Sequence, residues 1–360
     1  MAKTKVEFVC RECGASHHQW AGQCLDCKEW NTLEEIVLST ATSSKPESLK
    51  DLPASKVQSL SEVKAQNKDR LSTGLSELDR TLGGGLVDGS VVLIGGDPGI
   101  GKSTLILQAL ATLNSDNTTL YVSGEESAEQ VSERALRLGI KEDILFIGET
   151  HLEKVIKLSK DAKPKVIVID SIQTMVTDLS ASAPGSVTQV RDCAAQLTQY
   201  AKQTNTILLM IGHVTKGGAL AGPRILEHMV DAVLYFEGDA GGRYRIIRAV
   251  KNRFGAVNEI SVFAMGEKGL QQVSNPSSIF LSNQENPSSG SMVMVTREAT
   301  RPLLVEIQAL VDQSNGTPKR VSVGLDQNRL ALQLAILHKH SGIATFDQDV
   351  FINVVGGIKV

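Results

Sequence analysis

The sequence predicts an α/β fold with a mainly parallel sheet, preceded by a small domain that binds zinc through four cysteines. Three observations in the 360 residues support this prediction. Short β-branched runs alternate with helical stretches from residue 70 to about 273, which is typical of a parallel sheet with helices on both faces. A glycine-rich span after the first of these runs fits a phosphate-binding loop. Two C-x-x-C pairs lie within the first 27 residues.

The amino-terminal domain, residues 1–38, is predicted from its cysteine spacing. A doubled C-x-x-C arrangement places four thiolates around one tetrahedral zinc ion, and the predicted ligands are Cys10, Cys13, Cys24 and Cys27. A redox dithiol is the alternative, but it typically has a single C-x-x-C beside a βαβ pattern, for which this region is too short. His17 and His18 lie between the pairs, and we expect both to be solvated loop residues because four cysteines complete the site.

Composition restricts the class of protein but not its ligand. The formal net charge is −3, so any binding to nucleic acid must depend on local basic patches. The sequence has no apolar run near the ~20 residues that span a bilayer, and its polar start lacks the apolar part of a signal peptide, so we expect a cytoplasmic protein without a membrane partner. Residues 39–68, rich in Ser, Lys, Glu and Gln, are predicted to be a flexible linker.

The expected strands follow the linker in chain order. Four apolar runs are predicted to form the parallel sheet: 91–94, 119–122, 166–170 and 207–212. The runs 232–236 and 244–250 are joined by a glycine-rich, hairpin-type connection, and we expect both to extend the sheet as antiparallel strands. Cys193 falls on the apolar face of a predicted helix and is expected in the core.

The span 96–103 fits the motif G-x-x-x-x-G-K-[ST] between a strand-like run and a helix-like stretch. Its glycines let backbone N–H groups surround nucleotide phosphates, Lys102 supplies a positive charge, and the Ser103 hydroxyl can ligate magnesium. A chance glycine-rich turn is the alternative, and a dinucleotide fold is disfavoured because Lys-Ser follows the last glycine. The predicted nucleotide contacts are Gly96, Asp97, Pro98, Gly99, Ile100, Gly101, Lys102, Ser103 and Thr104.

Polar residues close three of the expected strands, and ligands of an open α/β sheet bind at the carboxyl ends of its strands. Glu125 and Glu126 follow the second strand, where a carboxylate can activate the water that attacks a γ-phosphate, although glutamates before a helix also favour its dipole. Asp170 closes the third strand and fits a magnesium site, with a turn cap as the alternative. His213 closes the fourth, as a γ-phosphate sensor or as a structural histidine.

A basic pentapeptide, Lys-Asn-Arg-Phe-Gly at 251–255, follows the last expected strand of the sheet. On composition alone a solvated turn is the favoured interpretation. Lys251 and Arg253 can also stabilise transition-state charge in a neighbouring subunit, as an arginine finger does.

With these motifs in place, the chain closely resembles the RadA (Sms) family of bacterial DNA repair proteins. The resemblance includes the four cysteines and continues into the third segment through residues 71–80, 96–103, 121–127, 212–216 and 221–224. Its most specific element is the pentapeptide 251–255, which resembles the signature that separates this family from RecA itself. On this resemblance the pentapeptide is assigned a function rather than a turn.

The resemblance implies a RecA-like P-loop ATPase, residues 69–276, that uses ATP, Mg²⁺ and Zn²⁺. It implies a homo-hexameric ring that binds single-stranded and branched DNA, promotes branch migration in repair and recombination, and meets recombinase, replication or repair proteins. The loop from Lys216 to Arg224 would face the central channel, where six copies concentrate positive charge. The implied catalytic residues are Glu125 as base, Lys102 on phosphate, and Lys251 and Arg253 across the subunit interface or on DNA, with Ser103 and Asp170 at magnesium and His213 near the γ-phosphate.

The third segment, residues 285–360, resembles only about the first half of a Lon protease domain and is therefore expected to be an incomplete α+β domain with an exposed sheet edge. No serine and lysine in it can be assigned as a peptidase dyad, so peptidase activity is not supported. One alternative function stays open: a RecA-like regulatory ATPase that acts on protein partners without DNA, because zinc domains also dock proteins.

Overall fold

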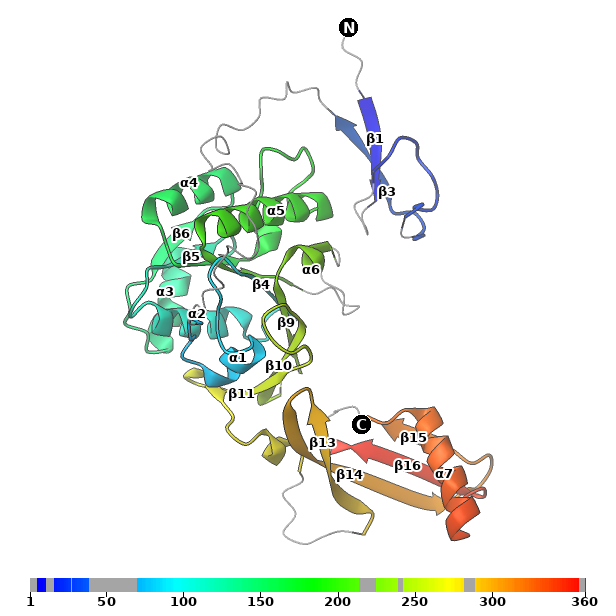
Figure 1. Ribbon diagram of the computed structural model, residues 1–360. Coiled ribbons are helices and arrows are strands. Elements are labelled where there is room, and N and C mark those ends of the chain that lie inside the picture. Colours follow the sequence, from blue (N-terminus) through cyan, green and yellow to red (C-terminus); the bar gives the residue numbers. More distant parts are fainter. Residues whose placement is uncertain are drawn as a thin grey trace, which may run out of the picture. The chain divides into compact units, whose positions relative to one another are not determined.

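The structure is a computed structural model that describes residues 5–10, 16–26, 28–38, 70–213, 225–238, 242–281, 289–355 and 360. The chain divides into two compact units, Met1–Gln272 and Val273–Val360, and Figure 1 labels their elements. The predicted linker, 39–68, lies outside the described residues, as do Cys13, Cys27, Lys216 and Arg224.

The cysteine-rich region forms a small antiparallel sheet of three strands: β1 (Lys5–Cys10), β2 (Ser16–His17) and β3 (Leu33–Leu38), in the order β2-β1-β3. Cys10 and Cys24 are buried together with Leu33. This cluster is small, so most of the apolar stabilisation that a larger domain draws from its core is not available to these strands. A bound metal is the usual compensation in a unit of this size.

The phosphate-loop region forms a nine-stranded sheet, in the order β12-β11-β10-β9-β4-β8-β7-β5-β6. Six neighbouring strands from β9 to β6 run parallel, which confirms the mainly parallel α/β fold. The four central strands with uninterrupted burial are β4, β5, β7 and β8. The nine strands are β4 (Val91–Gly95), β5 (Thr119–Ser123), β6 (Leu145–Gly148), β7 (Val166–Asp170), β8 (Ile207–Ile211), β9 (Ala232–Glu237), β10 (Tyr244–Asn252), β11 (Ile260–Gly266) and β12 (Gly269–Gln272).

One expected strand direction was wrong. β9 pairs with β4 in parallel, and only β10 reverses direction, pairing with β9 as an antiparallel neighbour. The reason is topological: the chain reaches β9 after the short helix α6 (Ile225–Met229), and the hairpin that turns it around comes only after β9. The sequence also gave no strand signal for β6, because this edge strand is only partly buried and lacks a continuous buried run.

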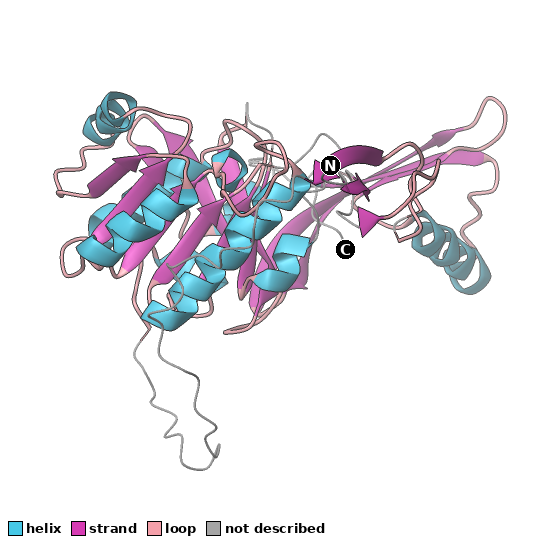
Figure 2. Ribbon diagram, turned by 90° about the horizontal axis from the view of Figure 1, so that it is seen from above, coloured by secondary structure: helices cyan, strands magenta, loops and turns pink. Residues whose placement is uncertain are grey.

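Helices cover both faces of this sheet, as the alternating pattern predicted (Figure 2). One face packs against α1 (Ser76–Thr81), α2 (Lys102–Leu113) and α3 (Ala128–Arg137) through residues such as Leu78, Leu110 and Val131. The other face packs against α4 (Leu152–Ala162), α5 (Val187–Thr204) and α6. A 3-10 turn, η2 (Ile172–Thr174), follows β7. Two cores therefore hold the sheet from opposite sides.

Two smaller expectations are also confirmed. Cys193 is fully buried in α5, and burial raises the pKa of its thiol to about 12, which makes it a core residue rather than a nucleophile. Ser127 caps α3 with a capping box, in which its side chain accepts from the Gln130 N–H and the Gln130 side chain accepts from the Ser127 N–H.

The unit from 273 onward is α+β, as expected. After the 3-10 turn η3 (Pro276–Ile279), a four-stranded sheet in the order β13-β14-β16-β15 carries one long helix. Its elements are β13 (Ser291–Glu298), β14 (Arg301–Gln313), β15 (Arg320–Val323), α7 (Gln327–Ser341) and β16 (Gln348–Val354). Among the helices of the described ranges, none has the length and apolar character needed to cross a lipid bilayer.

Candidate active site and metal centre

The strands of the large sheet end in register, which brings their terminal residues to one edge. Ile94 of β4 lies opposite Ile211 of β8, which lies opposite Asp170 of β7. Asp170 in turn lies opposite Ser123 of β5. Because these four strands are parallel, the segments that follow them emerge side by side. The phosphate loop, His213, Asp170 and the two glutamates therefore meet at the edge where ligands bind in such sheets.

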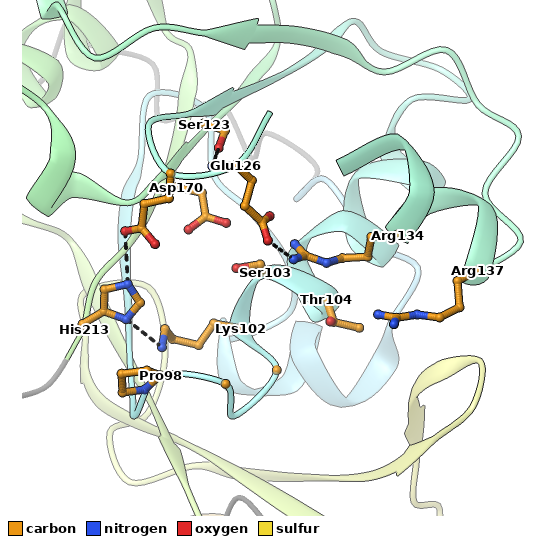
Figure 3. Close-up of a pocket in the computed structure, with 13 residues that line it drawn as sticks. Pro98, Lys102, Ser103, Thr104, Ser123, Glu126, Arg134, Arg137, Asp170 and His213 are labelled. Atoms are coloured by element: carbon orange, nitrogen blue, oxygen red, sulfur yellow. Dashed lines mark hydrogen bonds and ion pairs between the residues drawn. The ribbon is translucent and has the colours of Figure 1, made fainter. Parts of the chain in front are cut away.

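A cavity of about 360 Å³ lies at this edge (Figure 3). It is lined by parts of the phosphate loop, by the ends of β5, β7 and β8, and by α3. The lining residues are Pro98, Gly99, Gly101, Lys102, Ser103, Thr104, Ser123, Glu125, Glu126, Arg134, Arg137, Asp170 and His213. Sequence motifs that are far apart in the chain thus share one concave site.

The phosphate loop requires its glycines. Gly96, Gly99 and Gly101 have φ angles of 152°, 75° and 113°, in the region that side chains disfavour. A Cβ at Gly96 would also approach the Phe236 Cβ to 2.8 Å. The loop leads directly into α2, whose unpaired N–H groups begin at Lys102. An anion in the cavity therefore meets both backbone N–H groups and the positive end of a helix dipole.

Lys102 is held inside the loop, with only 3% of the residue exposed. Its Nζ donates to the carbonyl oxygens of Gly96 and Asp97, both at 2.8 Å, and lies 3.4 Å from His213 Nδ1. Burial lowers the pKa of Lys102, while the nearby Asp170, Asp97 and Glu125 oppose this shift. A negatively charged ligand at this position would favour the charged ammonium further.

Glu125 and His213 form a pair beside Lys102. The Ser171 hydroxyl donates to Glu125 Oε1 at 2.5 Å, and His213 Nε2 lies 3.3 Å from the same oxygen. The side chain of Glu125 is 42% exposed, so its carboxylate is open to water in the cavity. His213 therefore contacts Lys102 through one ring nitrogen and Glu125 through the other, which links the residues predicted as phosphate sensor, phosphate ligand and base.

Asp170 is the most buried carboxylate of the site. The Tyr121 hydroxyl donates to it, and so does the Ser103 hydroxyl. Burial raises the pKa of Asp170, the two hydrogen bonds lower it, and the neighbouring Glu125 and Glu126 add a smaller increase. A buried carboxylate close to other acids gains most from a divalent cation, and hard oxygen ligands suit Mg²⁺. The donors beside the phosphate loop therefore fit magnesium, with Ser103 and Asp170 as the residues that would hold it.

Sequence reasoning missed Arg134 and Arg137, which reach the cavity from the last turns of α3. Arg134 pairs with Glu126 through Nη2, while its Nη1 is buried without a hydrogen-bond partner in the described structure. The pairing explains why the two glutamates differ: Glu126 is neutralised by an arginine, and Glu125 faces Lys102 and His213. The only available signal was the eight-residue spacing from Glu126 to Arg134, which is about two helical turns.

Lys251 and Arg253 do not line this cavity. The Lys251 Nζ donates to the carbonyl oxygens of Glu227 at 2.5 Å and Val230 at 2.8 Å, at the carboxyl end of α6, and burial lowers its pKa. Arg253 Nη1 lies 3.3 Å from Asp231 Oδ1, and the Arg253 side chain is 59% exposed. Within one chain, the pentapeptide thus supports the end of α6 rather than the phosphates.

The predicted zinc ligands are represented by Cys10 and Cys24, because Cys13 and Cys27 lie outside the described residues. Both described cysteines are buried, and Cys10 Sγ is 3.2 Å from Thr32 Oγ1. Buried thiols at this spacing fit a soft, thiolate-binding metal such as zinc.

The expectation for His17 was wrong. It belongs to β2 rather than to a loop, and its Nε2 lies 3.5 Å from Cys24 Sγ. Pairing of β2 with β1 places it beside the cysteines instead of in solvent. His18 is exposed, as expected.

Comparisons with known proteins agree with both sites. The family model of an AAA domain matches residues 58–219, and that of a rubredoxin metal binding domain matches residues 8–35. A protein of Pseudomonas aeruginosa named DNA repair protein RadA is 58% identical over 362 residues, which cover 100% of this chain and 80% of that protein. The proteins of the same name from Escherichia coli and Bacillus subtilis are 54% and 46% identical, with the same coverage. The crystal structure of the RadB recombinase matches 57% of this chain and 100% of its own, with a TM-score of 0.45 and 21% identity.

Proposed function

Because the chain belongs to the family of the DNA repair protein RadA, we propose that it is a DNA-stimulated ATPase that processes recombination intermediates. In this proposal it binds single-stranded DNA and promotes branch migration of strand-exchange products. The observation that carries the proposal is the convergence of Lys102, Glu125 and Asp170 on one cavity beside the phosphate loop. These three groups supply what phosphoryl transfer requires: a cation on the phosphates, a base for water and a carboxylate for magnesium.

The proposed nucleotide site uses the loop from Gly96 to Thr104. Backbone N–H groups of the loop and of the start of α2 would hold the β- and γ-phosphates of ATP, and the Lys102 ammonium would exchange its two loop carbonyls for phosphate oxygens. Mg²⁺, when bound at Ser103 and Asp170, supplies charge neutralisation between the β- and γ-phosphates. Arg134 and Arg137 stand on the α3 side of the same cavity and would close it there.

In the proposed reaction Glu125 orients the attacking water and takes its proton. Its carboxylate is partly exposed and receives a hydrogen bond from Ser171, so one oxygen is fixed while water can reach the group. His213 contacts both Lys102 and Glu125. We propose that a γ-phosphate between these groups changes the His213 contacts. Since His213 directly precedes the loop 214–224, the change would be passed to that loop.

The proposed DNA-binding groups lie around that loop. Lys216 and Arg224 belong to it and lie outside the described residues. Lys251 and Arg253 would act on DNA or on the neighbouring subunit's phosphates in a homo-hexameric ring. Six copies of such a loop would concentrate positive charge in a channel even though one chain carries a net −3.

The proposed organisation keeps the ranges derived from sequence. Residues 1–38 bind zinc, 39–68 link, 69–276 carry the ATPase, and 285–360 form a partial domain similar to Lon protease, for which no peptidase activity is proposed. Recombinase, replication and repair proteins are the proposed protein partners. The proposed place of action is the cytoplasm, where bacterial DNA is found.

The first expected result is that single-stranded DNA raises ATP turnover about fivefold or more, the lower end of ordinary coupling between two sites. The stimulation should weaken as salt rises from 50 to 200 mM, because lysines and arginines that bind phosphates release counterions. Steady-state phosphate release from the zinc-loaded protein, with and without an oligonucleotide, measures both effects. Turnover that ignores DNA at low salt would defeat the motor function and favour a regulatory ATPase that acts on protein partners.

A second expected result concerns Lys251→Ala. Nucleotide binding should be unchanged, because Lys251 lies outside the cavity, while DNA-stimulated turnover should fall roughly tenfold, since two charge-assisted hydrogen bonds of about 1.5–3 kcal/mol each no longer hold the end of α6. α6 begins at Ile225, directly after the proposed DNA loop. Binding of a fluorescent nucleotide and turnover with DNA are the two measurements. The matched control is Lys268→Ala, an exposed lysine in the turn between β11 and β12. Wild-type behaviour of Lys251→Ala in both assays would make the pentapeptide an ordinary turn.

A further inference from the structure

His17 lies against the predicted zinc site rather than in solvent. Its Nε2 is 3.5 Å from Cys24 Sγ and 3.5 Å from Asp26 Oδ2. The His17 side chain is only 12% exposed, whereas that of Asp26 is 65% exposed. Burying a polar ring costs free energy unless its nitrogens find partners, and these two contacts supply them. His17, Cys24 and Asp26 also form a group whose ligand atoms all lie within 4.8 Å of one another.

The backbone fixes both sides of this group. His17 is in β2, opposite Phe8 of β1, and β1 ends at Cys10. Asp26 lies in a tight turn that the Lys28 N–H closes by donating to the Cys24 carbonyl at 2.9 Å. The imidazole and the carboxylate are therefore presented to the Cys24 sulfur by two separate, hydrogen-bonded segments.

Two roles of His17 fit these distances. Zinc bonds of about 2.0–2.3 Å place neighbouring tetrahedral donors roughly 3.3–3.8 Å apart, so Nε2 has the separation of a direct ligand. An N–H hydrogen bond to a thiolate has a similar length. The ligand count decides between them: a structural zinc site closes at four donors, and the two C-x-x-C pairs already supply four thiolates.

We propose that His17 is a positioning residue of the zinc site, whose Nε2–H donates to the Cys24 thiolate while the Asp26 carboxylate accepts from the same N–H and orients the ring. The hydrogen bond withdraws negative charge from one of four thiolates that repel one another, and it fixes the direction of the sulfur. Partners of this kind stabilise a bound metal without adding a ligand.

The test is zinc release from the full, zinc-loaded chain into excess chelator. His17→Ala should lose zinc about 10–100-fold faster, the usual effect of removing such a partner, and His17→Gln should recover part of the loss because its amide also donates an N–H. His18→Ala is the matched control and should release zinc at the wild-type rate. Both tryptophans of the chain, Trp20 and Trp30, lie in this unit, so their fluorescence shows whether each variant is folded before chelator is added. A wild-type release rate for folded His17→Ala would overturn the proposal.

Cobalt in place of zinc separates the two roles of His17. The wild-type protein and His17→Ala should give the same visible spectrum of Co²⁺ in four thiolates, because His17 does not bind the metal directly. If the ligand-field bands of His17→Ala differ from those of wild type, His17 is itself a ligand and the positioning role is wrong. These measurements need neither ATP nor DNA, so they stand apart from the proposed ATPase.

Discussion

Lys102→Ala is expected to reduce ATP turnover at least about a thousandfold, which corresponds to roughly 4 kcal/mol of transition-state stabilisation. The ammonium is 3% exposed and sits between two loop carbonyls and His213, where water screens its charge poorly. Nothing else among the described cavity residues places a lysine at the phosphate loop. Steady-state turnover, with nucleotide binding measured in parallel, checks the result.

Two controls sharpen this experiment. Lys102→Arg keeps the charge, but the larger guanidinium does not fit the buried position, so it should fail as well and show that geometry matters in addition to charge. Lys157→Ala removes an exposed lysine from α4 and should leave turnover unchanged. If Lys102→Ala kept more than about a tenth of wild-type turnover, the barrier difference would be under about 1.4 kcal/mol, and the lysine would not be the phosphate ligand.

Glu125→Gln is expected to lower turnover by about 10²–10⁴ while leaving nucleotide affinity nearly unchanged. The amide keeps the size of the side chain and its contact with the Ser171 hydroxyl, but it cannot take a proton from water. Single-turnover hydrolysis and equilibrium binding of a fluorescent nucleotide separate the two effects. A simultaneous loss of binding would instead indicate that the substitution had disturbed the phosphate loop.

Glu126→Gln is the matched control, because the two glutamates are adjacent and differ only in their surroundings. Glu126 pairs with Arg134, so its carboxylate is already neutralised and makes a poor base. We expect its substitution to cost less than about tenfold in turnover, the scale of one ion pair of modest strength. A larger loss for Glu126→Gln than for Glu125→Gln would exchange the roles of the two residues.

Much of the fold could be read locally. The central strands were expected within one or two residues of their observed bounds, because continuous β-branched runs bounded by polar residues have few other solutions. The edge strand β6 was missed, since partial burial weakens that pattern. The direction of β9 was wrong, because strand direction depends on the crossover before it and not on its own residues.

The site shows the same division. The span 96–103, the C-x-x-C pairs and the strand-terminal Asp170 and His213 were visible in the sequence, since each is a short motif whose chemistry is fixed by neighbours in the chain. Arg134 was invisible there: a helical arginine is usually solvated, and only packing of α3 beside β5 turns it toward Glu126.

The sequence by itself determined that this chain has a phosphate loop, a thiolate metal site and a membership in the RadA family, because contiguous residues carry those signals. Only the tertiary structure decided which glutamate is free to act as a base, that Lys251 holds α6, and that His17 faces Cys24. Each of these depends on the register between strands or helices that are distant in the chain. Such registers follow from burial of whole apolar faces, which no short motif encodes.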